Sequence, residues 1–345
     1  MTVMEGCEMK TVTTTQSEMT GREGQQGETA MVTTEKEESG GIVSWIIKFF
    51  SGGSDETGSS AVMSRSKKQQ HGAGRWSRRT LKGHQGHKFK DVRGLAFHND
   101  KLLVCDSDNN IVHILNQDYT CEKELGSFSG QFAKPFKPWS IAVSQDNLYF
   151  ILDESNVQLV VCDQNNKVIR IITLPANSDP WCIALVKGFV IVTDVNGHRV
   201  LKYSLDGMYI GEFGRRRDGH TKFNLPYFVA VNSRDVIMVS DNGNHCIKCF
   251  DTQFNYLYKY GHRSTGNAQL WSPQSIAVDG ADNVYVCDEG NDRISIWSED
   301  TTWLHHLFHR ELRWPRYIAV TADGDRIAGV SGSSRSWNEI VVFSK

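Results

Sequence analysis

The chain has 345 residues, of which 39 % are hydrophobic, and its formal net charge is −2 at neutral pH. This length and apolar content suffice for a large buried core, and the near-neutral charge excludes both a polycation that coats nucleic acid and an acidic solvating chain. The composition changes near residue 75, which divides the chain into an N-terminal segment, 1–75, and a strand-rich domain, 76–345.

The N-terminal segment, 1–75, is rich in Thr, Glu and Gly and has few apolar anchors, so we predict that it is disordered. A short apolar motif at 42–50 is the exception. Its length is about half of the roughly 20 residues that span a bilayer, and the acidic residues before it do not form a signal peptide. A locally collapsed linker, a helix that docks on a partner and interfacial membrane contact remain as alternatives for the motif. We predict no membrane span and a cytoplasmic location.

The domain at 76–345 repeats one pattern six times. Each copy has an apolar strand around an alanine and then a second apolar strand, which ends in aspartate in five copies; five copies also have a proline four residues before the alanine. The alanines are 42 to 47 residues apart and are Ala96, Ala142, Ala184, Ala230, Ala277 and Ala319. A period in the forties with several short strands per copy is typical of a β-propeller.

Two further strands follow in most copies, with apolar and polar residues alternating as one buried sheet face requires. Four strands per copy and six copies predict an all-β fold, a six-bladed β-propeller. The sixth copy ends at its third strand, 341–343, whereas the segment 79–82 aligns with a fourth strand and precedes the first copy. We therefore expect this N-terminal strand to close the last blade, which hides strand edges that promote aggregation.

The string DNGNHCI at 241–247, with its variants at 194–200 and 288–294, resembles the NHL repeat of tripartite-motif proteins. The resemblance covers about 76–345, although the first copy lacks its proline and the sixth has Ser331 in place of the aspartate. It implies a non-catalytic recognition module that binds single-stranded RNA or a protein substrate. The sequence has no RING, B-box or coiled-coil module, so no residue of this chain carries the ubiquitin-ligase activity of that family.

Loops after the second and fourth strands of each blade emerge on one face of a propeller, and those after the first and third emerge on the other. This rule predicts a basic first face that attracts phosphates or acidic peptides, and it includes Lys82, His84, His87, Lys88, Lys90, Lys134, Lys137, Arg199, Arg215, Arg216, Arg217, Lys222, Arg263, Arg293 and Arg313. The opposite face is predicted to be acidic, with Asp100, Asp118, Asp146, Asp163, Asp206, Asp251 and Asp279. Loop charges that only keep the protein in solution are the alternative.

One residue in each copy, directly after the proline or its equivalent, starts the innermost strand on the basic face. These residues are expected to ring the mouth of the central channel, and they are Arg93, Trp139, Trp181, Tyr227, Gln274 and Arg316. Aromatic planes, cations and an amide are the groups that hold unstacked bases of a single strand, and they also clamp peptides. The predicted ligand-binding residues are these six together with Arg215, Arg216, Arg217, Lys222 and Arg263.

The aspartates that end the second strands, Asp106, Asp153, Asp194, Asp241 and Asp288, are expected to accept backbone N–H bonds in the turns that follow. Cysteines at strand positions are expected to be buried thiols, and they are Cys105, Cys162, Cys182, Cys246 and Cys287. No secretory signal points to an oxidising compartment.

Six-bladed propellers also include hydrolases and a lyase that hold a metal ion on the channel axis with carboxylates or histidines. The channel mouth expected here offers Trp139, Trp181 and Arg316 instead. We therefore predict no catalytic residue, no metal and no cofactor, and an axis-metal enzyme is the remote alternative. Single-stranded RNA is the expected ligand, and a protein substrate or adaptor, with a ubiquitin ligase as partner, is the second hypothesis.

Overall fold

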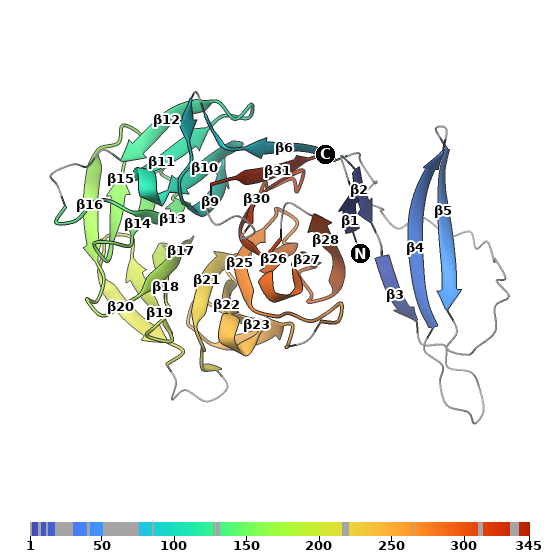
Figure 1. Ribbon diagram of the computed structural model, residues 1–345. Helices are drawn as coiled ribbons and strands as arrows, with labels where there is room; N and C mark the ends of the chain where they lie inside the picture. Colours follow the sequence, from blue (N-terminus) through green and yellow to red (C-terminus); the bar gives the residue numbers. More distant parts are fainter. Residues whose placement is uncertain are drawn as a thin grey trace.

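The computed structural model describes residues 76–345 except Gln85, Ser127, 129–131, 216–220, Ser264, 310–312 and 332–337, and it gives the backbone of five strands before residue 51. Six four-stranded antiparallel blades are arranged around a central axis (Figure 1). The prediction of a six-bladed, all-β propeller is confirmed.

Each blade begins with its innermost strand. Blade 1 consists of β9 (Val92–His98), β10 (Lys101–Asp106), β11 (Ile111–Leu115) and β12 (Cys121–Gly126). Blade 2 consists of β13 (Pro138–Val143), β14 (Tyr149–Asp153), β15 (Gln158–Cys162) and β16 (Val168–Thr173). Blade 3 consists of β17 (Pro180–Val186), β18 (Phe189–Asp194), β19 (Arg199–Ser204) and β20 (Tyr209–Phe213).

The second half of the ring repeats this order. Blade 4 consists of β21 (Pro226–Val231), β22 (Ile237–Asp241), β23 (Cys246–Phe250) and β24 (Tyr256–Tyr260). Blade 5 consists of β25 (Pro273–Val278), β26 (Val284–Asp288), β27 (Arg293–Trp297) and β28 (Trp303–His309). Blade 6 consists of β29 (Pro315–Val320), β30 (Arg326–Ser331), β31 (Ile340–Ser344) and β6 (Ser77–Leu81). Short 3₁₀ turns follow three of the second strands at η1 (Ser107–Asn109), η3 (Asn242–Asn244) and η4 (Glu289–Asn291).

The closing strand of the ring comes from the N-terminal side of the domain. Strand β6 pairs antiparallel with β31, from Ile340 opposite Leu81 to Ser344 opposite Ser77. Each inner strand contacts the inner strands of the two neighbouring blades, and β29 of blade 6 contacts β9 of blade 1. The predicted closure of the last blade is therefore confirmed. A small hairpin of β7 (Gly83–His84) and β8 (His87–Lys88) connects β6 to blade 1.

The core lies between adjacent blades. For example, Leu103 and Ile114 of blade 1 pack with Ile141 and Ile151 of blade 2 in one cluster. Neighbouring blades cover both faces of the second and third strands, so all five residues of β14 are buried. The expectation of one buried face is wrong for these middle strands, and exposed and covered residues alternate only on outer strands such as β12. The five cysteines predicted to be buried thiols are free and buried.

The segment 1–75, predicted to be disordered, contains β1 (Thr2–Glu5), β2 (Glu8–Thr11), β3 (Thr13–Ser17), β4 (Ala30–Ser39) and β5 (Ile42–Phe50). Strand β1 pairs in parallel with β28, and β3, β4 and β5 form a sheet of their own. The apolar motif at 42–50 coincides with β5. The remainder of this segment lies outside the described residues. In the described part of the chain, no helix has the length and apolarity required to cross a membrane.

Candidate functional site

The aspartate at the end of each second strand ties the turn that follows it to the start of the inner strand of the same blade. All five carboxylates are fully buried. Each carboxylate accepts a hydrogen bond from the backbone N–H of a residue one or two positions before the inner strand. The donor–acceptor pairs and their distances are Asp91 to Asp106 (3.1 Å), Lys137 to Asp153 (3.0 Å), Asp179 to Asp194 (2.9 Å), Asn224 to Asp241 (2.7 Å) and Trp271 to Asp288 (2.7 Å). The prediction that these aspartates accept backbone N–H bonds is confirmed, but the donors lie mainly across the blade and not in the turn.

A second link joins the turns of blades 3 and 4 to the next blade. The fourth residue after the aspartate has a left-handed backbone in five blades. Two of these residues are His198, with a φ of 51°, and His245, with a φ of 58°. The ring Nδ1 of His198 accepts the N–H of Leu225, and that of His245 accepts the N–H of Ser272, both at 3.1 Å. Burial and the nearby Arg263 lower the pKa of His245. These histidines therefore position the inner strands of blades 4 and 5.

One half of the channel mouth is an arc of aromatic contacts (residues Arg93, Trp139, Trp181 and Tyr227), which we call the aromatic arc. The guanidinium of Arg93 lies 5.1 Å from the ring centre of Trp139. Trp139 meets Trp181 edge to face at 4.6 Å, and Trp181 meets Tyr227 in the same way at 4.7 Å. All four side chains are partly exposed. The structure thus brings together four of the six residues predicted to ring the channel, one from each of blades 1 to 4.

The other half of the mouth is polar. The Glu289 carboxylate accepts hydrogen bonds from Gln274 Nε2 at 2.7 Å and from Arg316 Nε at 2.6 Å. In blade 1, which neighbours blade 6, Asp91 accepts a bond from Arg93 Nε at 2.8 Å. Burial raises the pKa of Asp91 despite its arginine partner. Both arginines of the mouth are therefore held by carboxylates, and the sequence analysis assigned neither acid to the site.

The basic character predicted for this face needs correction. Arg216 and Arg217 lie outside the described residues, and Arg215 forms an ion pair with Glu212. Arg199 and Arg293 were counted as surface cations, yet each binds the buried aspartate of its own blade, Asp194 or Asp288, at 2.7 Å. Acidic residues also lie on the same loops and form ion pairs with the predicted cations, such as Asp108 with Lys137 and Asp292 with Arg313. The exposed cations that remain are Lys88, Lys90, Lys134, Lys222 and Arg263.

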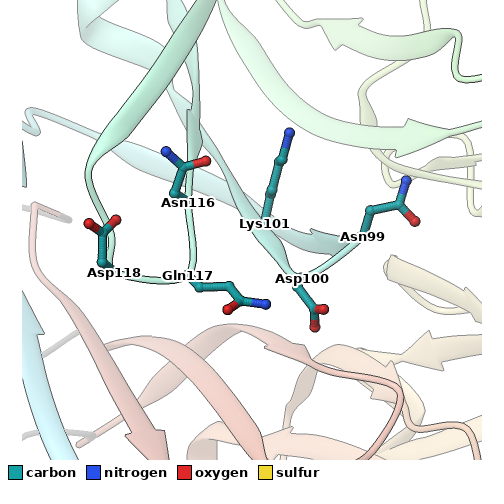
Figure 2. Close-up of a pocket in the computed structure, with 6 residues that line it drawn as sticks. All are labelled: Asn99, Asp100, Lys101, Asn116, Gln117 and Asp118. Carbon is teal, nitrogen blue, oxygen red and sulfur yellow. The ribbon is translucent and has the colours of Figure 1, made fainter.

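A hollow of about 430 Å³ lies away from the mouth, on the loops between strands of blade 1 (Figure 2). Its lining is polar and consists of Asn99, Asp100, Lys101, Asn116, Gln117 and Asp118. Arg326 of blade 6 forms an ion pair with Asp100 at 2.7 Å, and Arg79 of β6 donates to the carbonyl of Asp118. Since small-molecule sites are mostly apolar, this hollow is better explained as part of the contact between blades 6 and 1.

No group of three metal-ligating side chains occurs at the mouth among the residues that the structure describes, and the one such group lies in blade 1. The mouth therefore offers stacking planes, two guanidinium groups and two carboxylates. These groups are suited to holding a planar or charged ligand by contact.

Comparisons with known proteins agree with this architecture. The sequence model of the NHL repeat matches residues 177–203 and 223–250. The chain therefore carries NHL repeats, in blades 3 and 4 of a six-bladed propeller. No curated protein matches the chain significantly.

Solved structures with the same fold include two lyases and a WD40 domain. A streptogramin B lyase matches with a TM-score of 0.57 and 15 % identity, over 77 % of this chain and 97 % of that one. A catalytically inactive virginiamycin B lyase from Staphylococcus aureus, with quinupristin, matches with a TM-score of 0.56 and 14 % identity, over 78 % of this chain and 99 % of that one. The WD40 β-propeller domain of Doa1 matches with a TM-score of 0.55 and 12 % identity, over 92 % and 89 %. At these identities the likeness shows the fold alone.

Proposed function

We propose that this propeller is a recognition module of the tripartite-motif type, which binds single-stranded RNA at the channel mouth. The aromatic arc carries this proposal, because Trp139, Trp181 and Tyr227 form one continuous series of partly exposed rings. Stacking of a base on an aromatic side chain contributes about 1–3 kcal/mol and requires no particular sequence. Two stacked bases are enough to outweigh the weaker attraction of dispersed surface charges.

The exposed cations around the arc support the same ligand. Lys88, Lys90, Lys134, Lys222 and Arg263 are exposed and lie in the segments that connect outer strands to the inner strands of the next blade. Cations on these segments can attract the phosphates on either side of a stacked base. Contacts with three to five phosphates lower the affinity by about 10- to 100-fold for a fourfold rise in salt concentration.

A basic peptide of a protein partner is the second candidate, and the carboxylates of Asp91 and Glu289 favour it. Both acids lie beside arginines at the mouth, so an arginine of a peptide can compete for them and stack on the aromatic arc. Under this alternative, the module presents a protein substrate to a ubiquitin ligase partner. The free, buried cysteines accord with a reducing compartment such as the cytoplasm for either ligand.

The proposal is tested by fluorescence anisotropy with the full chain and a randomised single-stranded RNA pool across a salt series. We expect submicromolar binding at low salt, a steep loss of affinity with salt, and loss of binding in the double variant Trp139→Ala, Trp181→Ala. Tyr256→Ala is the matched control, because Tyr256 is an exposed aromatic on the outer strand β24. Absence of binding even at low salt contradicts the RNA proposal and leaves the peptide as the ligand to test.

A further inference from the structure

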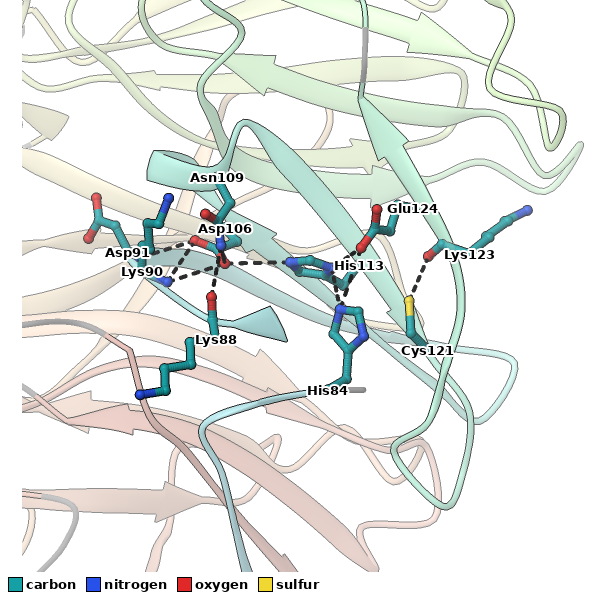
Figure 3. A network of polar contacts seen from close by, with 10 residues as sticks. All are labelled: His84, Lys88, Lys90, Asp91, Asp106, Asn109, His113, Cys121, Lys123 and Glu124. Carbon is teal, nitrogen blue, oxygen red and sulfur yellow. Dashed lines mark hydrogen bonds and ion pairs between the residues drawn. The ribbon is translucent and has the colours of Figure 1, made fainter. Parts of the chain in front are cut away.

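A cluster of metal-ligating side chains lies in blade 1, away from the channel mouth (Figure 3). It consists of His84 from β7, His113 from β11, and Cys121 and Glu124 from β12. One ligand atom from each of the four residues lies within 4.8 Å of those of the others. None of the four takes part in the recognition site proposed above.

Strand register explains why three of these residues share one face. His113 stands directly opposite Glu124, and Leu115 stands opposite Cys121. Alternate residues of a strand point to the same face, and the register shifts between Ile114 and Leu115 so that an additional residue of β12 is accommodated. The shift therefore places Cys121 and Glu124 on the face of His113, although they are three positions apart.

The fourth residue is brought in by the linker that connects β6 to blade 1. The β7–β8 hairpin lays the ring of His84 against that of His113, with ring centres 4.5 Å apart. Phe89 covers both rings, at 6.2 Å from His84 and 5.4 Å from His113. Both histidine side chains are buried, with 3 % and 2 % exposure, whereas Glu124 is 41 % exposed. Solvent therefore reaches the cluster from the side of Glu124.

Three ligand atoms have the spacing that a zinc ion requires. His84 Nε2 lies 2.8 Å from His113 Nδ1, His113 Nδ1 lies 3.2 Å from Glu124 Oε1, and His84 Nε2 lies 3.6 Å from Glu124 Oε1. A circle through three points at these distances has a radius of about 1.9 Å, slightly less than the zinc–nitrogen and zinc–oxygen distances of about 2.0–2.2 Å. An ion bonded to all three atoms therefore lies just outside their plane, as in a tetrahedral site.

The other nitrogen of His113 faces a second carboxylate. His113 Nε2 lies 3.4 Å from Asp106 Oδ2, and Asp106 is itself fixed by the N–H groups of Lys90 and Asp91 and by Asn109. A carboxylate behind the imidazole is the usual support of a metal-bound histidine.

We propose that His84, His113, Glu124 and Cys121 bind one Zn²⁺ ion, which fastens the closing linker of the ring to blade 1. Nitrogen, oxygen and sulfur ligands in a four-coordinate set are typical of zinc. Three atoms already converge, and the Cys121 thiol, now 3.4 Å from the carbonyl of Lys123, turns toward them as the fourth ligand. The ion is a structural one, because the four ligands fill its coordination.

The test uses the untagged full chain, stripped with a chelator and titrated with Zn²⁺ alone in competition with a chromophoric chelator. We expect one high-affinity ion per chain and a higher melting temperature with zinc. His84→Ala and Glu124→Gln should each weaken binding by tenfold or more. His87→Ala and Glu122→Gln are the controls, because both residues are exposed neighbours of the ligands on the same hairpin or strand, and they should bind zinc as the wild type does.

Two results overturn the proposal. One is the absence of stoichiometric binding at micromolar zinc, and the other is equal affinity in the wild type and Glu124→Gln. Because the Glu124 side chain is partly exposed, this variant should fold even if the His84 variant does not. Substitution with Co²⁺ tests the fourth ligand: a thiolate-to-cobalt charge-transfer band that disappears in Cys121→Ser is expected, and its absence from the wild type overturns the role of Cys121.

Discussion

The carboxylate of Glu289 accepts a hydrogen bond from Arg316 Nε at 2.6 Å, across the boundary between blades 5 and 6. The same carboxylate also holds Gln274, so half of the channel mouth depends on one acidic side chain. Since Glu289 is the only member of this trio with a negative charge, its replacement changes the charge that a ligand meets at this half of the mouth.

Replacement of Glu289 by Gln should separate the two candidate ligands. The amide oxygen still accepts a bond from Arg316, but the negative charge is lost, so RNA affinity should rise about two- to fivefold. Affinity for an arginine-containing peptide should fall. Fluorescence anisotropy with both ligands measures the two effects, and Glu122→Gln, on an exposed residue of the outer strand β12, is the control. A fall in RNA affinity contradicts the proposed arrangement of RNA at the mouth.

Two of the buried aspartates should differ strongly in their effect on stability. Asp241 holds the Lys248 ammonium at 2.7 Å, with side-chain exposures of 0 % and 9 %, so Asp241→Asn leaves a buried charge without its partner and should cost about 3–5 kcal/mol. Among the described residues, the donors to Asp153 are neutral, such as Asn156 and Gln158, and Asp153→Asn should cost about 1–3 kcal/mol. Urea unfolding of both variants gives the comparison, and equal costs would show that the Lys248 pair contributes nothing.

The stability of the fold should decrease in mildly acidic solution because of His306. Burial, with the nearby charge of Arg293, lowers the pKa of His306 from its ordinary 6.5 to about 2, and its Nε2 has no hydrogen-bond partner among the described residues. Between these two values the unfolded chain binds a proton that the folded chain does not. The free energy of unfolding should therefore fall by up to about 1.4 kcal/mol per pH unit below pH 6.5.

Urea unfolding at pH 6.5 and at pH 5.5 measures this effect. The upper value is the ordinary pKa of histidine, 6.5, and carboxylates remain ionised about one unit below it. His306→Phe should remove this part of the slope, whereas His87→Phe, on an exposed residue, should leave it unchanged. The same slope in His306→Phe and in the wild type would mean that other groups take up the proton.

Removal of the closing strand should open the ring. A chain that lacks residues 1–75 keeps β6 and its five pairs with β31, so it should remain monodisperse and fold. A chain that lacks residues 1–82 leaves β31 as an uncovered edge, which promotes association between sheets. Size-exclusion chromatography and thermal melting distinguish the two chains. Equal behaviour of both would show that β6 is dispensable for closure.

The ring was predictable from the sequence because the repeated residues occupy the same structural positions in every blade. The prolines and alanines mark the inner strands, and the resulting register is sufficient to place Trp139, Trp181 and Tyr227 at one mouth. The position of 79–82 as a closing strand followed from the missing fourth strand of the last copy. Whether the residues of the mouth bind RNA or a peptide stays a prediction.

Contacts that one side chain makes with residues of another blade or linker were not predictable from the repeat pattern. Glu289 follows Asp288 in a 3₁₀ turn, and only the coordinates show that it reaches Gln274 and Arg316. His84 and His113 are 29 residues apart, and neither belongs to a familiar metal-binding spacing, so the sequence analysis predicted no metal. The only signal was a histidine at the third position of β11, where blades 4 and 5 have Lys248 and Ser295.

The pairing of Ser77 with Ser344 has a consequence for biosynthesis. These residues are 267 positions apart in the chain, and at about 5–20 residues per second a ribosome needs on the order of 10–50 s to make the intervening polypeptide. During this time β6 has been translated but its partner strand does not yet exist. Blade 6 is therefore completed only after β31 has been made, and a chaperone that shields β6 until then is expected to increase the yield of folded protein.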